Sequence, residues 1–401
     1  MNNKTKTSNI IPVNILNFLV QEERRSGVIL IIVAIAALFA ANSSLSSIYF
    51  DFIYTELTFG IVSLDIQHWV SEGLMAIFFL VVVLEVKREF IDGELRTWRK
   101  ASFPVIAAIG GMLLPALIYS SINTQSPQSI GWAIPIATDI AIGIGVLTLL
   151  GKRIPKNIRV FLLTLAIIDD IGSIIVIGIF YNHPSNITAL IIAIILSLSL
   201  LIVRKKKWWI TGFMIMGFCV WYCLLLAGIS GTMAGVIVAA LAPLVKRPRK
   251  SMYLQSSEKI EDLLLPITAY IIVPLFVFCS AGLVFRDVSL TQGDSLSIFL
   301  GVVLGLLIGK PVGIITITWI ATKLKLTHRP EGMSWVNILG VGFIAGIGFT
   351  ISLLIANLSF NSYPSLLNTS IFAVFVGSIV SGAIGVLILG ISTSSKRSRN
   401  A

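Results

Sequence analysis

The chain contains 401 residues, of which 56% are hydrophobic and only 12% are charged, whereas soluble proteins average about 25% charged residues. This composition excludes an ordinary soluble domain and predicts a protein that crosses a membrane many times. Because one span needs about 20 apolar residues, the length accommodates about a dozen spans with short loops. We therefore expect residues 1–401 to form a single integral membrane domain.

Apolar runs between polar breaks predict an all-α polytopic protein with twelve transmembrane helices. The first run follows Arg24 and Arg25 and could be read as part of a signal peptide. The long charged segment before it contains Glu22 and Glu23, which favours a retained helix. The expected spans are residues 27–41, 69–86, 103–120, 130–150, 158–180, 187–203, 209–223, 228–244, 262–284, 296–321, 335–358 and 367–391.

The distribution of basic residues predicts the orientation of these spans. All but two of the 30 lysines and arginines lie in the N-terminal segment, in alternate loops or in the C-terminal tail. The opposite loops contain only Arg286, and Lys310 lies inside the tenth span. Because basic loops stay in the cytoplasm, both termini are expected there. The same rule explains the net charge of +11 without a nucleic-acid partner.

The longest external connection, residues 42–67, has aromatic and β-branched residues on both sides of Gly60. This pattern is compatible with a β-hairpin and equally with an irregular loop.

The cysteines and histidines predict neither a disulfide framework nor a metal site. The cysteines lie in apolar stretches, and the histidines lie in or next to loops without a metal-ligand spacing. These residues are Cys219, Cys223, Cys279, His68, His183 and His328. The sequence therefore predicts no resident cofactor.

Four ionisable residues lie near the middle of predicted spans, where charge is costly and indicates function. Asp139, Asp169 and Lys310 each lie 11 or 12 residues from the cytoplasmic end of their spans, about 16–18 Å deep at 1.5 Å per residue. With Asp170, three acids therefore share one level with one base. A purely structural ion pair is the alternative, but it leaves two carboxyls uncompensated.

Asp169 and Asp170 are neighbours, so on a helix their side chains point about 100° apart. One can face an aqueous cavity while the other faces a neighbouring helix. Carboxyls that are buried close together hold protons more tightly than solvated ones. Such groups can exchange a proton for a hard cation that prefers oxygen ligands, such as Na⁺ or Li⁺.

The fourth and eleventh spans are rich in glycine and polar residues, which predicts broken helices. Each is the middle span of a three-span group, over residues 103–180 and 296–391, and the two groups have opposite orientations. Paired interrupted helices in inverted repeats are typical of transporter binding sites. Asp139 could then offset half-helix N-termini, and Lys310 the C-termini. The alternative is that the glycines only permit close helix packing.

Two further acids lie near the ends of the second span. Glu85 lies at the cytoplasmic rim, where it could line an entrance or form a solvated salt bridge. Glu72 lies one turn inside the outer end, where it could line an external funnel or reach the headgroups.

Several strings together resemble the NhaA family of bacterial Na⁺/H⁺ antiporters, and the similarity runs from the first span to the last. The matching strings are Phe78–Leu80, Leu84–Glu89, Ala133–Pro135, Ala137–Ile140, Leu165–Asp170, Gly309–Pro311 and Gly346–Thr350.

The resemblance implies a secondary active transporter of the bacterial inner membrane, not an enzyme. It implies electrogenic exchange of cytoplasmic Na⁺ or Li⁺ for external protons, for sodium and pH homeostasis. Cation binding is expected at Asp170 with Asp169, and Lys310 would pair with Asp169. Thr138 and Asp139 would belong to the crossing of the broken helices. Glu85 would lie in the cytoplasmic funnel, and residues 42–67 would form a hairpin that joins two copies into a homodimer.

The sequence departs from the family at two histidine positions. The ninth span begins with Glu261-Asp262-Leu263 where known members have Glu-His, and Ser230 stands where a histidine is often found. Histidine is the usual switch near neutral pH. We still expect activity to rise with pH, through the buried aspartates and Glu261.

Three other functions remain as comparisons. A Na⁺-coupled symporter of an organic anion would need an amphipathic pocket. It would not need Lys310. An intramembrane aspartyl protease needs two aspartates on different helices with a Gly-x-Gly-Asp string, which is absent. A prenyl-transfer enzyme needs spaced acidic pairs, whereas Asp170 is followed by Ile171-Gly172-Ser173.

Overall fold

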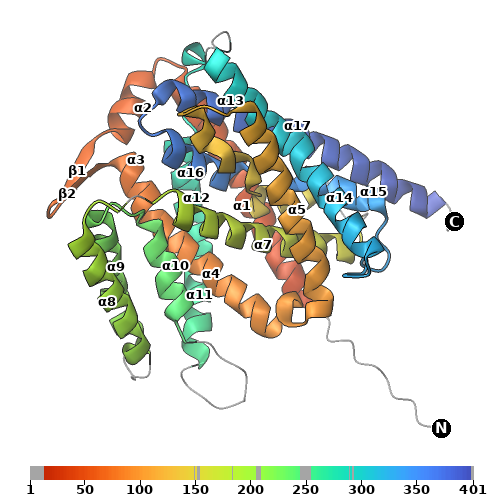
Figure 1. Cartoon of the computed structure of the whole chain (residues 1–401), viewed down its shortest axis with the longest axis horizontal. Coiled ribbons are helices and arrows are strands. Elements are labelled where there is room, and N and C mark those ends of the chain that lie inside the picture. The colour runs from red at the N-terminus through yellow and green to blue at the C-terminus, as the bar shows by residue number, and fades with distance from the viewer. Residues whose placement is uncertain are drawn as a thin grey trace.

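The computed structural model describes residues 13–148, 150, 154–182, 184–204, 209–243, 254–288, 290 and 293–398. Within them the chain forms a bundle of helices with one small sheet at its edge (Figure 1). The first half contains α1 (Val13–Ala41), α2 (Ser46–Ile53), β1 (Glu56–Phe59), β2 (Val62–Asp65), α3 (Ile66–His68), η1 (Trp69–Leu74), α4 (Met75–Asp92), η2 (Glu94–Arg96), α5 (Trp98–Ile122), η3 (Gln128–Ile136), α6 (Ile140–Thr148), α7 (Lys156–Phe180) and α8 (Ile187–Val203). The second half contains α9 (Trp209–Leu226), α10 (Thr232–Leu241), α11 (Leu254–Ile267), η5 (Thr268–Ile272), α12 (Val273–Ser280), η6 (Phe285–Asp287), α13 (Gly293–Leu304), η7 (Gly305–Gly309), α14 (Lys310–Lys323), α15 (Trp335–Ala345), α16 (Phe349–Phe360) and α17 (Pro364–Ser398). The predicted loop histidine His183 lies outside the described residues.

Several of these helices have the length and apolar composition of membrane spans. Among the described residues, seven helices are long and apolar enough to cross one, and the number reaches ten when each of three bent helix pairs counts as one span. The bends are 113° between α1 and α2, 44° between η3 and α6, and 47° between α15 and α16. The breaks predicted in the fourth and eleventh spans are therefore present.

Each of the twelve predicted apolar runs falls on one of these helices, on a bent pair, or on the shorter apolar helices α8 and α10. The count of twelve membrane crossings, the inverted repeats and the orientation of the termini stay predictions. Helix formation follows from the solvent, because lipid offers no partner for a backbone group that is left outside a helix.

The two strands confirm the hairpin expected within residues 42–67. Strands β1 and β2 pair antiparallel, with Glu56 opposite Asp65 and Phe59 opposite Val62. The hairpin projects from the edge of the bundle (Figure 1). It occupies only part of the connection, because helix α2 precedes it.

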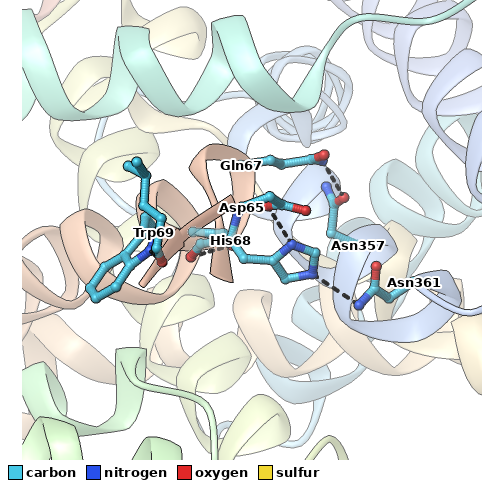
Figure 2. A network of polar contacts seen from close by, with 8 residues as sticks. Asp65, Gln67, His68, Trp69, Asn357 and Asn361 are labelled. Carbon is cyan, nitrogen blue, oxygen red and sulfur yellow. Dashed lines mark hydrogen bonds and ion pairs between the residues drawn. The ribbon is translucent and has the colours of Figure 1, made fainter. Parts of the chain in front are cut away.

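A small polar network fixes the base of the hairpin to the end of α16 (Figure 2). Asp65 accepts the backbone N–H of His68 at 2.7 Å, and its carboxylate lies 2.7 Å from Nδ1 of the same histidine. The other ring nitrogen lies 3.0 Å from Nδ2 of Asn361, and Gln67 donates to Asn357 at 3.1 Å. His68 therefore has a positioning contact on each side of its ring.

Helices α5 and α14 pack with their backbones unusually close. A Cβ atom on Gly313 would lie 2.1 Å from the carbonyl oxygen of Gly110, and one on Gly110 would lie 2.3 Å from that of Gly313. Only two facing glycines permit this approach. Because Lys310 begins α14, the contact fixes the depth and direction of that lysine.

We expect Gly313→Val to force these two helices apart and to lower stability by about 1–3 kcal/mol, the usual cost of overpacking. The melting temperature of the purified protein in detergent measures the effect. Gly390→Val is the matched control, because it adds the same side chain where the nearest atom to a new Cβ is 3.4 Å away. Equal melting temperatures for the two variants would contradict the packing argument.

Candidate functional site

The two helix breaks lie against each other and share hydrogen bonds. The backbone N–H of Asp139 donates to the carbonyl oxygen of Ile347 at 2.6 Å. The hydroxyl of Ser352, near the start of α16, donates to the carbonyl oxygen of Ile134 at 2.6 Å. Broken helices expose backbone groups that find no water inside a membrane. Each break therefore provides hydrogen-bond partners for the other.

Gly348 permits this close crossing. A Cβ atom there would lie 2.3 Å from the Ser352 hydroxyl oxygen and 3.1 Å from the carbonyl oxygen of Ala137. A larger residue would push α16 away from η3. Gly348, in the glycine-rich string of the eleventh span, thus allows the two breaks to pack closely together.

Asp139 lies where the N-termini of both half-helices converge. One carboxylate oxygen accepts the backbone N–H of Ile142 in α6 at 3.0 Å, and the other accepts that of Thr350 in α16 at 3.1 Å. Asp139 is only 3% exposed. A carboxylate at two helix N-termini offsets two partial positive charges and satisfies two otherwise unpaired N–H groups.

Lys310 lies at the opposite pole of the crossing. Its ammonium donates to the carbonyl oxygen of Ile136 at 2.5 Å, at the C-terminal end of η3, and lies 3.0 Å from an Asp169 carboxylate oxygen. Both side chains of this ion pair are fully buried. A cation at a helix C-terminus offsets its partial negative charge, so Lys310 stabilises the break and Asp169 together.

Asp169 is shared between two partners. The carboxylate oxygen that faces Lys310 also lies 2.6 Å from the Thr138 hydroxyl. That hydroxyl lies 2.9 Å from the carbonyl oxygen of Ala345. Its single hydrogen serves one of these two acceptors at a time. Thr138 therefore connects the crossing of the breaks to the ion pair.

Asp170 differs sharply from its neighbour. It is 3% exposed, and its Oδ1 atom, like that of Asp169, has no hydrogen-bond partner among the described residues. It lines a cavity of about 140 Å³. The adjacent aspartates of α7 thus have separate surroundings, one paired with a lysine and the other facing a cavity.

The cavity contains carboxyls and hydroxyls but no base. It is lined by residues of α1, α4, α6, α7, α11, η5, α12 and α16, together with the break at Thr138 and Asp139. Among the described residues that line it, Asp139, Asp170 and Glu85 are the titratable ones, and none is a lysine, arginine or histidine. These lining residues are Ser26, Leu30, Phe78, Val81, Val82, Glu85, Val86, Thr138, Asp139, Ile140, Ala141, Ile167, Asp170, Leu265, Thr268, Ala269, Val273, Thr350 and Ile351.

Arg88 joins the two acids that were expected at the cytoplasmic end. One guanidinium nitrogen lies 2.7 Å from a Glu261 carboxylate oxygen, and another lies 3.7 Å from Glu85. Arg88 is a residue of this site that hydropathy and motif spacing did not reveal. Its position three residues after Glu85, on the same face of a helix, was the available signal. Arg88, Glu85 and Glu261 therefore form one charged group at the cytoplasmic end, and Glu85 places this group on the wall of the cavity.

Glu72 has a different environment from this cavity, which it does not line. Its carboxylate accepts the Ser230 hydroxyl at 2.9 Å and the backbone N–H of Gly231 at 2.5 Å. These contacts tie η1 to the start of α10. A role in an external funnel stays a prediction.

The chain is similar to known proteins along most of its length. Residues 17–389 match the sequence profile of the family described as Na⁺/H⁺ antiporter 1. The chain is 45% identical to the Na⁺/H⁺ antiporter NhaA of Shigella dysenteriae serotype 1 over 372 residues, which cover 90% of this chain and 93% of that protein. It is similar at 44% and 45% identity, with the same coverage, to the NhaA antiporters of Escherichia coli O1:K1 and O139:H28.

The convergence of two helix N-termini on one carboxylate yields a stability prediction. Asp139→Ala leaves two buried N–H groups without acceptors, at a cost of about 1–3 kcal/mol each. Asp139→Asn keeps one acceptor oxygen and should fall between the alanine variant and the wild type. Melting temperatures in detergent measure the order. Exposed Asp51→Ala is the control, and an Asp139→Ala variant as stable as this control would refute the assignment.

Proposed function

The chain belongs to the Na⁺/H⁺ antiporter 1 family, and we propose that it exchanges cytoplasmic Na⁺ or Li⁺ for external protons across a bacterial inner membrane. We propose both termini on the cytoplasmic side, because the basic loops would then lie inside. Removal of cytoplasmic sodium and uptake of protons would serve sodium and pH homeostasis.

The observation that carries the proposal is the state of Asp170. A buried carboxylate oxygen without a partner is costly, unless a proton or cation occupies the site. Asp170 borders a cavity whose other titratable residues are also acids. This arrangement attracts a cation and offers it the oxygen ligands that hard cations prefer.

Asp169 and Lys310 supply the second part of the proposed cycle. Because the ammonium contacts both Asp169 and a backbone carbonyl, protonation of Asp169 weakens the ion pair but leaves Lys310 one partner. In the proposed cycle, one entering Na⁺ releases two protons from the pair formed by Asp169 and Asp170. Such an exchange moves net charge, so the membrane potential can drive it.

The crossing of the broken helices is the proposed moving element. Thr138, Asp139 and Lys310 connect the two breaks to each other and to Asp169. Occupation of Asp170 by a cation or by a proton changes the charge beside this crossing. We propose that this change shifts the balance between inward-facing and outward-facing states.

Several larger features complete the proposal. We propose twelve membrane crossings with inverted repeats over residues 103–180 and 296–391. We also propose a homodimer joined through the hairpin of β1 and β2, which projects from the bundle (Figure 1). The exposed main chain at the edge of a two-stranded sheet favours pairing with a second copy.

The alternative of a Na⁺-coupled symporter for an organic anion fits the cavity less well. An anionic substrate would meet Asp139, Asp170 and Glu85 with no basic side chain on the wall to bind it. Repulsion between the like charges and the loss of their hydration both oppose such binding.

Proton flux in everted membrane vesicles tests the exchange. Respiration acidifies the vesicle lumen, and added Na⁺ or Li⁺ should release the trapped protons when the transporter is present. Asp170→Asn should abolish this release at saturating Na⁺, because it removes the anionic ligand. Added K⁺ should release few protons in the wild type.

Exposed Asp287→Asn is the matched control for the loss of one aspartate, and it should exchange like the wild type. Full exchange by Asp170→Asn, at the same amount of protein in the membrane, would sink the proposed function.

The charged group at the cytoplasmic end gives a prediction for pH. We expect exchange to rise between about pH 6.5 and 8.5, because protons compete with the cation for the same carboxyls. Glu261→Gln leaves the positive charge of Arg88 less compensated near the cavity. That charge favours the loss of protons from the cavity acids and opposes cation entry. The pH of half-maximal exchange should therefore fall by about one unit, equivalent to ~1.4 kcal/mol.

The same vesicle assay across this pH range measures the shift. Glu56→Gln removes an equal charge from the exposed hairpin. The hairpin precedes the start of the Ile66–Ile91 helix, and Arg88 lies near the other end of that helix, so the pH profile should stay unchanged. An identical profile for Glu261→Gln and the wild type would remove Glu261 from the pH response.

A further inference from the structure

Thr268, a buried threonine between α11 and α12, lines the cavity that Asp170 borders. Thr268 is the first residue of η5, a π-helical turn between α11 and α12. Its side chain is almost fully buried, at 5% exposure. Single π-helical turns inside helices often mark functional positions, because they displace side chains from the regular helical register.

The Thr268 hydroxyl lacks the partner that three other buried helical threonines have within their own helices. Thr164, Thr318 and Thr369 each donate to the carbonyl oxygen four residues earlier in their own helix, at 2.6–2.9 Å. The hydroxyl oxygen of Thr268 has no hydrogen-bond partner among the described residues. An unsatisfied buried polar group needs an explanation, and a ligand or water within the cavity supplies one.

The other two threonines on the cavity wall are already engaged. The Thr138 hydroxyl lies beside Asp169 and Ala345, and the Thr350 side chain lies near the Asp139 carboxylate, which accepts the backbone N–H of Thr350. Among the threonines that line the cavity, Thr268 alone therefore offers an uncommitted oxygen. Asp170 offers the second, at its unpartnered Oδ1 atom.

These two oxygens suit a hard monovalent cation. Na⁺ and Li⁺ bind oxygen ligands, and one carboxylate with one hydroxyl leaves the remaining positions for water. A cavity of about 140 Å³ holds the cation and several waters. Neither oxygen belongs to the hydrogen bonds that hold the crossing together, so binding and release need not break those bonds.

We propose that the Thr268 hydroxyl is a direct ligand of the transported cation, together with the Asp170 carboxylate and water. This inference rests on the proposed exchange of Na⁺ or Li⁺ for protons. It assigns cation binding to the segment between α11 and α12, in addition to the crossing of the broken helices.

Thr268→Val tests the inference, because it replaces the hydroxyl by a methyl group of nearly equal size. We expect the half-saturating Na⁺ and Li⁺ concentrations in vesicles at fixed pH to rise about tenfold, with the maximal rate retained. Thr268→Ser keeps the hydroxyl and should stay within about twofold of the wild type. Thr164→Val is the matched control, since that equally buried hydroxyl is bonded to its own helix.

The outcomes separate this inference from the proposed function. Wild-type half-saturation in Thr268→Val, in a protein that Asp170→Asn inactivates, overturns the role of Thr268 alone. Full activity of Asp170→Asn overturns the proposed function itself. Equal shifts in Thr268→Val and Thr164→Val would assign the effect to packing and would overturn the inference.

A binding measurement covers the case of a valine variant that does not accumulate in the membrane. Na⁺ should raise the melting temperature of purified wild-type protein and of Thr268→Ser, because a ligand of the folded state stabilises it. Thr268→Ala should need about tenfold more Na⁺ for the same rise. An unchanged Na⁺ dependence in Thr268→Ala would overturn the inference.

Discussion

The mutual hydrogen bonding of the two helix breaks is the constraint on which the rest of the site depends. A break leaves backbone donors and acceptors unpaired, and a membrane interior offers them no water. Here the N–H of Asp139 pairs with the carbonyl of Ile347, and Ser352 pairs with the carbonyl of Ile134. Neither break can move alone without losing these partners. The crossing therefore behaves as one unit, and the charged residues around it must fit that unit.

Asp139 and Lys310 divide the electrostatic work of the crossing between them. The carboxylate offsets the N-termini of α6 and α16, while the ammonium offsets the C-terminal carbonyl of η3. Lys310 also reaches Asp169, so one residue stabilises both the backbone break and a carboxylate. Because Lys310 contacts both groups, a change in the charge of Asp169 alters the electrostatics of the crossing.

The sequence predicted those features that follow from the solvent and from local spacing. Twelve apolar runs lie on helices because lipid demands internal backbone hydrogen bonds, and the glycine-rich strings mark the breaks because close crossings exclude side chains. Contacts between distant segments were harder to predict from the sequence. The bond of Glu72 to Gly231, the bridge from Arg88 to Glu261 and the unpaired hydroxyl of Thr268 depend on how helices pack. Hydropathy does not encode helix rotation, and the π-helical turn at Thr268 alters that rotation locally.

The imbalance of three acids and one base is resolved in space. Lys310 faces η3 and Asp169, and it does not line the cavity. In the proposed cycle an entering cation would therefore meet Asp170, Asp139 and Glu85, and no base among the described lining residues would repel it. Asp139 is already committed to two N–H groups, and Glu85 lies near the guanidinium of Arg88. Of the three cavity acids, Asp170 is thus the carboxyl that can accept a cation or a proton without the loss of a structural contact. The adjacency of Asp169 and Asp170 on one helix then has a physical consequence, because the helix turns one carboxyl toward the lysine and the other toward the cavity.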